Sequence, residues 1–154
     1  MLRLRQPRPD EAGALTALCL RSKAMHGYDD VFMAACGEEL TVDLRKPGGR
    51  FMVADEDGVT VGVAEISVEG DAAELQKLFV EPSRVGGGIG RKLFGWARDE
   101  AAALGAACMM IDSDPGAREF YLAMGASAIG TSSSGSIPGR FLPRLRLDLR
   151  RCAT

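Results

Sequence analysis

Residues 75–94 read Leu75-Gln-Lys-Leu-Phe-Val80-Glu-Pro82-Ser-Arg-Val-Gly86-Gly-Gly88-Ile-Gly90-Arg-Lys-Leu-Phe94. The pattern predicts a strand that ends at Val80, a turn that begins at Pro82, a glycine-rich loop and then a helix. Glycines between a strand end and a helix start let backbone amides approach a ligand closely. The free N–H groups of the helix's first turn favour an anion. We therefore expect this loop to bind phosphate.

Two other phosphate-binding loops do not fit the same residues. A P-loop requires Lys-Ser or Lys-Thr after its last glycine, whereas Gly90 is followed by Arg91 and Lys92. The dinucleotide fingerprint requires a third glycine or an alanine where Arg91 stands. A flexible glycine linker is the remaining alternative, but a linker is not usually framed by a Leu-Phe-Val strand and an amphipathic helix.

The composition is that of an ordinary globular domain. The chain has 154 residues, of which 46% are hydrophobic and 26% charged, and its formal net charge is -2. These values predict a single domain over residues 1–154 and argue against disorder. The nearly balanced charge gives no sign of a nucleic-acid partner.

No metal site, disulfide framework or membrane segment is expected. The four cysteines, at positions 19, 36, 108 and 152, form no Cys-x-x-Cys pair, and His26 is the single histidine. This pattern favours a protein without metal in the reducing cytoplasm. The N-terminus lacks the apolar core of a signal peptide, and no apolar run approaches the ~18 residues of a membrane helix.

Hydrophobic periodicity and turn residues predict seven strands and four helices. The second helix is expected to stop at Gly37, and Asp114 is expected to cap the fourth. Strands are predicted at 2–5, 50–54, 59–68, 72–80, 107–111, 126–130 and 141–149, with helices at 10–25, 29–36, 88–104 and 114–124.

The turn between the third and fourth strands predicts their register. A two-residue turn centred at 70–71 would place Glu65 opposite Gln76 and Ser67 opposite Glu74, so these four polar side chains would share one face of the sheet. The other face is assigned to the core and carries Ile66, Val68, Leu75 and Phe79.

The glycine-rich stretch resembles the acyl-CoA loop of the GNAT superfamily of N-acetyltransferases, Val-x-Pro-x-x-Arg/Gln-Gly-x-Gly-x-Gly/Ala. Val85 replaces the Arg or Gln of that pattern. The segment from Asp114 to Gly125 is similar to a second family motif, Asn-x-x-Ala-x-x-Phe-Tyr-x-x-x-Gly-Phe, with Asp114 in place of Asn and Ala126 in place of the last aromatic. With the element order β-α-α-β-β-β-α-β-α-β-β, the resemblance implies an α/β (α+β) fold. This is the GNAT acyl-CoA N-acyltransferase fold, a mixed, mostly antiparallel seven-stranded sheet with about four helices.

The resemblance implies an enzyme that moves the acetyl group of acetyl-CoA directly to a primary amine of a small molecule in a ternary complex. The pantetheine arm of CoA would lie along the fourth strand, and the pyrophosphate on the glycine-rich loop. The residues assigned to the cofactor are Leu78, Phe79, Val80, Val85, Gly86, Gly87, Gly88, Ile89, Gly90, Arg91, Asp114 and Phe120.

The resemblance also nominates the catalytic groups. Tyr121 would be the general acid for the leaving thiolate, with a core aromatic role as the alternative. An alkylammonium has a pKa of about 10.4, so a base or a chain of water molecules must deprotonate the acceptor. Glu74 is the candidate base, and Glu65 beside it would raise its pKa, although both glutamates could instead lie on a solvated sheet face.

The acceptor pocket is expected between the first two helices and the last two strands. Residues assigned to it are Glu65, Ser22, His26, Tyr28 and Arg140, of which Arg140 could pair with a substrate carboxylate and His26 could be a second base or a helix cap. Two other functions stay open: a non-catalytic acyl-CoA-binding regulatory module and a protein or peptide N-acetyltransferase. A homodimer through the last strand is also considered.

Overall fold

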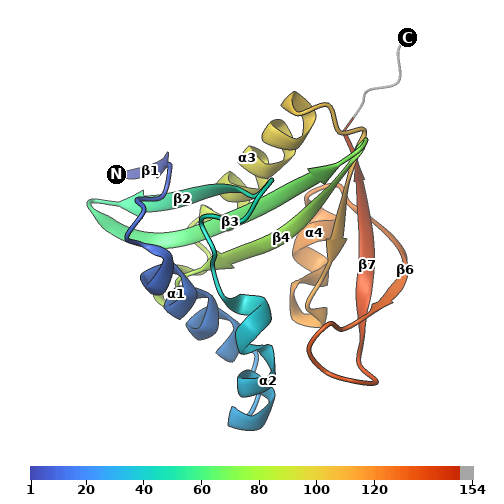
Figure 1. Ribbon diagram of the computed structural model, residues 1–154, viewed down its shortest axis with the longest axis horizontal. Helices are drawn as coiled ribbons and strands as arrows, with labels where there is room; N and C mark the ends of the chain where they lie inside the picture. Colours follow the sequence, from blue (N-terminus) through green and yellow to red (C-terminus); the bar gives the residue numbers. More distant parts are fainter. Residues whose placement is uncertain (150–154) are drawn as a thin grey trace.

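The computed structural model describes residues 1–149, so the last five residues of the predicted 1–154 domain, Cys152 among them, lie outside the described part. The strands form one sheet in the order β1-β2-β3-β4-β5-β7-β6 (Figure 1). Their bounds are β1 (Leu2–Arg5), β2 (Arg50–Glu56), β3 (Val59–Glu69), β4 (Ala72–Val80), β5 (Cys108–Asp112), β6 (Ser127–Ser133) and β7 (Phe141–Asp148). Every neighbouring pair is antiparallel except β4 and β5, which are parallel.

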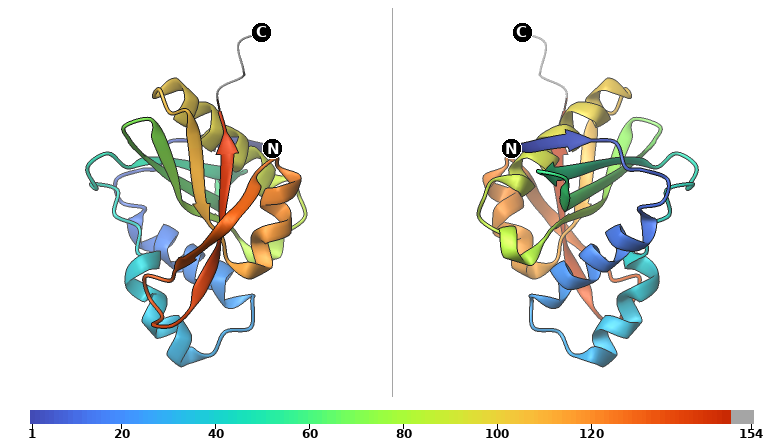
Figure 2. Two further views of the ribbon diagram at one scale, coloured as in Figure 1. Left: turned by 90° about the vertical axis from the view of Figure 1, so that its right-hand side faces the viewer. Right: turned by 90° about the vertical axis from the view of Figure 1, so that its left-hand side faces the viewer.

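The helices cover the two faces of this sheet. They are α1 (Ala12–Ala24), α2 (Asp30–Leu40), α3 (Ile89–Ala103) and α4 (Arg118–Ala123). Both views in Figure 2 show α1 and α2, in blue and cyan, on the opposite side of the sheet from α3, in olive. In α1, the spacing of Leu15, Leu18 and Cys19 creates one apolar stripe, which packs against Val53 and Val63. The predicted fold class is confirmed.

A buried ion pair ties the first strand to the first helix. The Arg5 guanidinium donates to both carboxylate oxygens of Glu11, at 2.7 and 2.9 Å, and to Asp55 Oδ2 at 2.9 Å. Glu11 is only 5% exposed and also accepts from the Arg8 backbone N–H. The hydrogen bond from Arg5 is the main reason that the pKa of Glu11 falls to about 2.

We expect Glu11→Gln to destabilise the fold at pH 7 by about 2–3 kcal/mol, because a carboxylate whose pKa is lowered on folding stabilises the folded state. That stabilisation is fully present above the ordinary pKa of 4.5 and is lost as the pH falls toward 2. Urea unfolding at pH 7 and at pH 3 measures the difference, with the exposed Glu119→Gln as control. A penalty that stayed the same at pH 3 would contradict this role for the Glu11 charge.

The second helix continues past its predicted stop. Gly37 lies inside α2, which ends at Leu40. A glycine ends a helix when it adopts a positive φ, and Gly37 does not. Because Leu40 is buried against the α1 side of the sheet, packing favours three further helical residues.

The register between β3 and β4 differs from the predicted one at a single point. The turn at 70–71 and the pair Ser67↔Glu74 are confirmed, but a β-bulge leaves Gln76 without a partner, so Glu65 pairs with Lys77. The pairing of Glu65 with Gln76 was therefore wrong. One extra residue inverts the alternation of every side chain that follows.

The inverted alternation changes which side chains lie on each face. Leu75 packs with Ile66 on the α3 side, whereas Phe79 packs with Val63 on the α1 side. The assignment of Leu75 and Phe79 to one core face was therefore wrong. Lys77 is turned to the α1 side together with Glu65.

Candidate active site

The parallel strands β4 and β5 separate midway along β4. Their pairing ends at Leu75↔Ile111, and β4 continues to Val80 whereas β5 stops at Asp112. In Figure 1, β4 and β7 lie close at the upper right and diverge toward the bottom of the view. The edge of β4 from Gln76 onward therefore offers unpaired backbone groups to an extended ligand.

A cavity of about 530 Å³ lies beside this edge and is bounded by the glycine-rich loop. Gly86 and Gly88 have φ values of +90° and +83°, a left-handed conformation that favours glycine, and Gly88 is the N-cap of α3. The predicted cofactor residues that line this cavity are Leu78, Val80, Val85, Gly86, Gly88, Ile89, Gly90, Arg91 and Phe120. The free N–H groups at the start of α3 and the absence of an acidic residue from its first turn suit a phosphate.

Three predicted cofactor residues do not line this cavity. Phe79 packs on the α1 side of the sheet, as described above. The Gly87 N–H donates to the Arg84 carbonyl, inside the loop. Asp114 lines a neighbouring, smaller cavity.

This smaller cavity, of about 130 Å³, adjoins the first on the α1 side of β4. Five residues line both cavities and so mark their junction: Ser22, His26, Leu78, Ala117 and Tyr121. They come from α1 and the turn after it, from β4, and from the segment that leads into and forms α4. Two molecules bound in the two cavities would therefore meet beside Leu78 and Tyr121.

Tyr121 is buried at this junction between Phe94 and Phe120. Burial is the main cause that raises the pKa of its phenol well above the ordinary value of 10, and the negative charge of Asp114 adds to the effect. The hydroxyl therefore stays protonated at physiological pH. It makes no hydrogen bond to another residue among 1–149, so its proton is available to a ligand.

His26 lies at the same junction, just after α1. Its Nδ1 is 4.0 Å from Asp114 Oδ1, and it packs directly on Gly116. A Cβ at position 116 would lie only 2.7 Å from Nδ1, so the imidazole position depends on a glycine there.

Asp114 joins three separate segments at the wall of the smaller cavity. Its Oδ1 accepts from the Gly116 N–H, and its Oδ2 accepts from the Tyr28 hydroxyl at 2.7 Å and from Lys23 Nζ at 3.3 Å. Burial opposes ionisation of Asp114, but these partners outweigh it and hold its pKa below the ordinary value. The pKa of Tyr28 is raised, mainly by burial and then by Asp114.

The predicted acceptor residue Arg140 belongs to the same network. Its Nη2 donates to the Tyr28 hydroxyl at 2.7 Å and lies 3.6 Å from Asp114 Oδ2. The guanidinium also lies over the stacked rings of Tyr28 and Phe32, 5.1 and 4.8 Å from their centroids. Tyr28, Asp114 and Arg140 thus form one hydrogen-bonded network, of which Asp114 lines the smaller cavity and the other two line neither cavity.

The two candidate glutamates are each held by a different cation. Arg144 donates to both carboxylate oxygens of Glu74, at 2.8 and 3.3 Å, and Glu74 lines neither cavity. Glu65 is fully buried and accepts from Lys77 Nζ at 2.9 Å. Each carboxylate is therefore paired with its own positive partner and not with the other carboxylate.

Lys77 is the residue at this site that the sequence analysis missed. It lines the smaller cavity next to Leu78, although its neighbours Leu75 and Phe79 are apolar. A lysine inside a buried strand requires a carboxylate nearby, and Glu65 on the preceding strand was the available one. The sequence therefore indicated that Lys77 needs a carboxylate partner. It did not indicate the bulge that brings Lys77 and Glu65 together.

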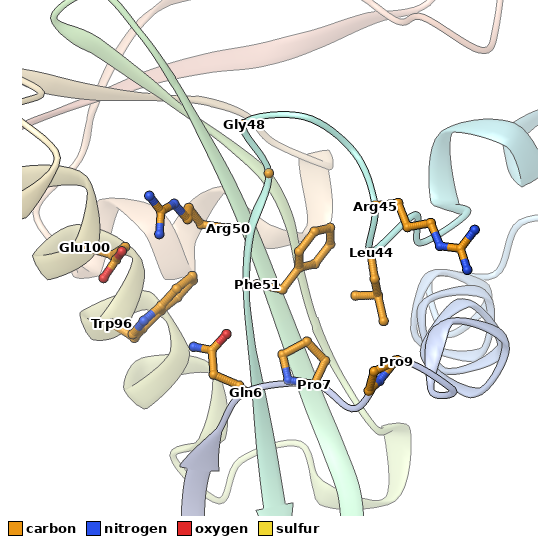
Figure 3. Close-up of a pocket in the computed structure, with 11 residues that line it drawn as sticks. Gln6, Pro7, Pro9, Leu44, Arg45, Gly48, Arg50, Phe51, Trp96 and Glu100 are labelled. Atoms are coloured by element: carbon orange, nitrogen blue, oxygen red, sulfur yellow. The ribbon is translucent and has the colours of Figure 1, made fainter.

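A third hollow, of about 600 Å³, lies at the open edge of β2, beyond the last residue that β1 pairs with it. Figure 3 shows Arg50, Trp96 and Glu100 on one side of the β2 ribbon and Phe51 and Leu44 on the other. The loop before β2 closes one side of this hollow and reaches toward Glu65, because a Cβ on Gly49 would lie 3.6 Å from Glu65 Oε2. This hollow shares no residue with the two cavities at β4.

Solved structures with the same arrangement define the class of fold. PaiA N-acetyltransferase from Thermoplasma acidophilum, solved with coenzyme A, has a TM-score of 0.78 at 16% identity, over 96% of this chain and 99% of that one. A GCN5-related N-acetyltransferase from Rhodopseudomonas palustris has a TM-score of 0.77 at 26% identity, over 96% and 95%. The fold is that of the N-acetyltransferases.

The family follows from the sequence. A model of the acetyltransferase (GNAT) family matches residues 17–126, and the chain belongs to this family, as its two motifs predicted. The IAA acetyltransferase of Azospirillum brasilense is 39% identical over 72 residues, which are 46% of this chain and 47% of that protein. The match thus spans about half the length of this curated relative.

Neither a membrane-spanning helix nor a cluster of metal ligands is found among residues 1–149. None of the helices there is both long and apolar enough to cross a membrane. The same residues include no group of three or more His, Cys, Asp and Glu side chains placed to hold a metal ion.

Proposed function

We propose that this protein transfers the acetyl group of acetyl-CoA to a primary amine of a small molecule. The observation that supports this most strongly is the junction of two cavities at Leu78 and Tyr121, one bounded by the glycine-rich loop and the other by polar side chains. The first suits CoA and the second suits an acceptor. Acetyl-CoA supplies the activated thioester, and the chain positions the two reactants and moves protons.

The cavity of about 530 Å³ beside the glycine-rich loop would hold CoA through backbone groups. The pyrophosphate would bind the N–H groups between Val85 and Arg91, at the N-terminus of α3. The pantetheine arm would lie along the unpaired edge of β4, near Leu78 and Val80. Backbone amides on this edge are the available donors for the negative charge that develops on the thioester oxygen.

Two side chains at the junction would handle protons. His26 would remove a proton from the acceptor ammonium, directly or through water, with Asp114 stabilising the resulting imidazolium. Tyr121 would donate its proton to the departing thiolate. We prefer His26 to Glu74 as the base because His26 lines both cavities and Glu74 lines neither.

The activity is tested by thiol release from acetyl-CoA across a panel of small primary amines. We expect release that depends on both acetyl-CoA and an amine, together with CoA binding measured by titration calorimetry. Binding of CoA without turnover of any small amine or peptide would instead favour a regulatory acyl-CoA-binding module. Turnover of peptides alone would favour a protein or peptide acetyltransferase.

The identity of the base is tested by two variants. His26→Gln should lower kcat at least about tenfold. The loss of a general base usually lowers kcat by about 100-fold or more, but water can partly replace a half-exposed imidazole. Glu74→Gln should lower kcat only slightly. Gly116→Ala should resemble His26→Gln, because its Cβ would displace the imidazole. A large loss in Glu74→Gln with full activity in His26→Gln would return the role to Glu74.

Three further predictions accompany this function. We propose that residues 1–154 act as a single domain and that the protein works in the cytoplasm with acetyl-CoA and an amine as its partners. Homodimer formation stays a prediction, which light scattering tests.

A further inference from the structure

Lys77 is a buried cation of the smaller cavity, next in the chain to the junction residue Leu78. It directly precedes Leu78, lines the smaller cavity and is 8% exposed. Its Nζ donates one hydrogen bond, to Glu65 Oε1 at 2.9 Å, and has no second partner among residues 1–149. An ammonium has three N–H donors, so Lys77 can donate to a bound molecule as well.

The carboxylate that pairs with Lys77 does not cancel the local positive charge. Glu65 Oε2 lies 3.7 Å from Lys46 Nζ, so two lysines share one buried carboxylate. This second oxygen has no hydrogen-bond partner among the described residues, and Glu65 lines neither cavity. Among the β4 residues that line the smaller cavity, Lys77 is the one that carries a charge, and this charge is positive.

Across the cavity from β4, the lining has one lysine, Lys23, beside the carboxylate of Asp114. Lys23 and Arg140 share the single carboxylate of Asp114. They are 14% and 18% exposed, so solvent screens their charges only in part.

The remaining carboxylates of this cavity are more exposed. Asp112, 42% exposed, is held by Arg144 and by the Ser132 hydroxyl, and Glu39 accepts from the Ser136 hydroxyl. Solvent therefore screens these two carboxylates more than it screens the buried Lys77 ammonium, whose interaction with a bound anion would be stronger.

We propose that the acceptor is an amino-acid-like molecule that carries a carboxylate beside its reactive amine, and that Lys77 binds this carboxylate. This inference rests on the proposed acetyl transfer. The cavity of about 130 Å³ is far smaller than the 300–1,000 Å³ of sites for drug-sized ligands, which favours a small acceptor. With the amine beside Leu78 at the junction, a carboxylate on the neighbouring carbon would accept from the adjacent Lys77 ammonium.

The first experiment compares matched acceptors by thiol release from acetyl-CoA. A panel of amino acids is assayed against the carboxamide of each, which keeps the amine and side chain but removes the negative charge. We expect kcat/KM to be about 10- to 100-fold higher for the best amino acid than for its carboxamide, the range of a charge-assisted hydrogen bond. Equal values across the panel would overturn the carboxylate inference while leaving acetyl transfer intact. No turnover of either set by a protein that binds CoA would overturn both.

The second experiment tests Lys77 itself. Lys77→Met should bring the ratio of amino acid to carboxamide close to one, mainly by raising KM for the amino acid. Because this variant leaves Glu65 buried without Lys77, the double variant Lys77→Met/Glu65→Gln provides the same test with no unpaired charge. Arg98→Met, on the exposed face of α3, is the control and should keep the wild-type ratio. A ratio that stayed high in both Lys77 variants would overturn the assignment to Lys77.

Discussion

Tyr121→Phe should lower kcat by about 100-fold or more while CoA binding stays close to that of the wild type, because only the proton donor is lost. The phenylalanine ring would keep the packing against Phe94 and Phe120. Thiol-release kinetics measure kcat, and titration calorimetry measures CoA affinity. Thermal unfolding should be nearly unchanged, which separates the chemical role from a structural one.

The pH dependence provides a second measurement on Tyr121. Because burial and Asp114 raise its pKa above 10, the phenol should remain a proton donor throughout the range from pH 7 to pH 9. We therefore expect no decrease in kcat from Tyr121 ionisation in that range. If Tyr121→Phe kept more than half of the wild-type kcat, the leaving thiolate would be protonated by another group.

Gly88→Val should weaken CoA binding by about 100-fold. Gly88 has φ +83°, where a β-branched residue costs about 1–3 kcal/mol, so valine would drive the loop out of the conformation that begins α3. Because the first-turn N–H groups of α3 are the proposed phosphate donors, the same change would misalign them. Titration of CoA into the folded variant measures the effect.

Two variants act as controls for Gly88→Val. Gly87 does not have a positive φ, and a Cβ there would meet only the Arg84 carbonyl at 3.4 Å, so Gly87→Ala should bind CoA nearly normally. Arg84 is already paired with Glu56, so Arg84→Ala should weaken binding less than Gly88→Val does. If Gly88→Val bound CoA like the wild type, the glycine-rich loop would not be the phosphate site.

Much of this site could be predicted because its signals are local. The sequence of Val80 to Gly90 contains both the strand end and the glycines whose positive φ values shape the loop. Tyr121 and Asp114 follow from a second short motif, and Asp114 caps the turn as expected. The long-range contacts of Asp114 were not predicted. Its second carboxylate oxygen accepts from Tyr28 and Lys23, which are far away in the chain.

Local sequence signals predicted the element order, the glycine-rich loop and the family, because periodicity and dihedral preference act over a few neighbouring residues. Three features depend on packing between distant segments and were not predicted: Gln76 is bulged, Lys77 pairs with Glu65, and His26 packs on Gly116. The position of a bulge depends on how both faces of a strand pack against other elements, and one extra residue reverses every side chain after it. The proposed acceptor site therefore depends on contacts between distant segments, whereas the glycine-rich loop is encoded within one segment.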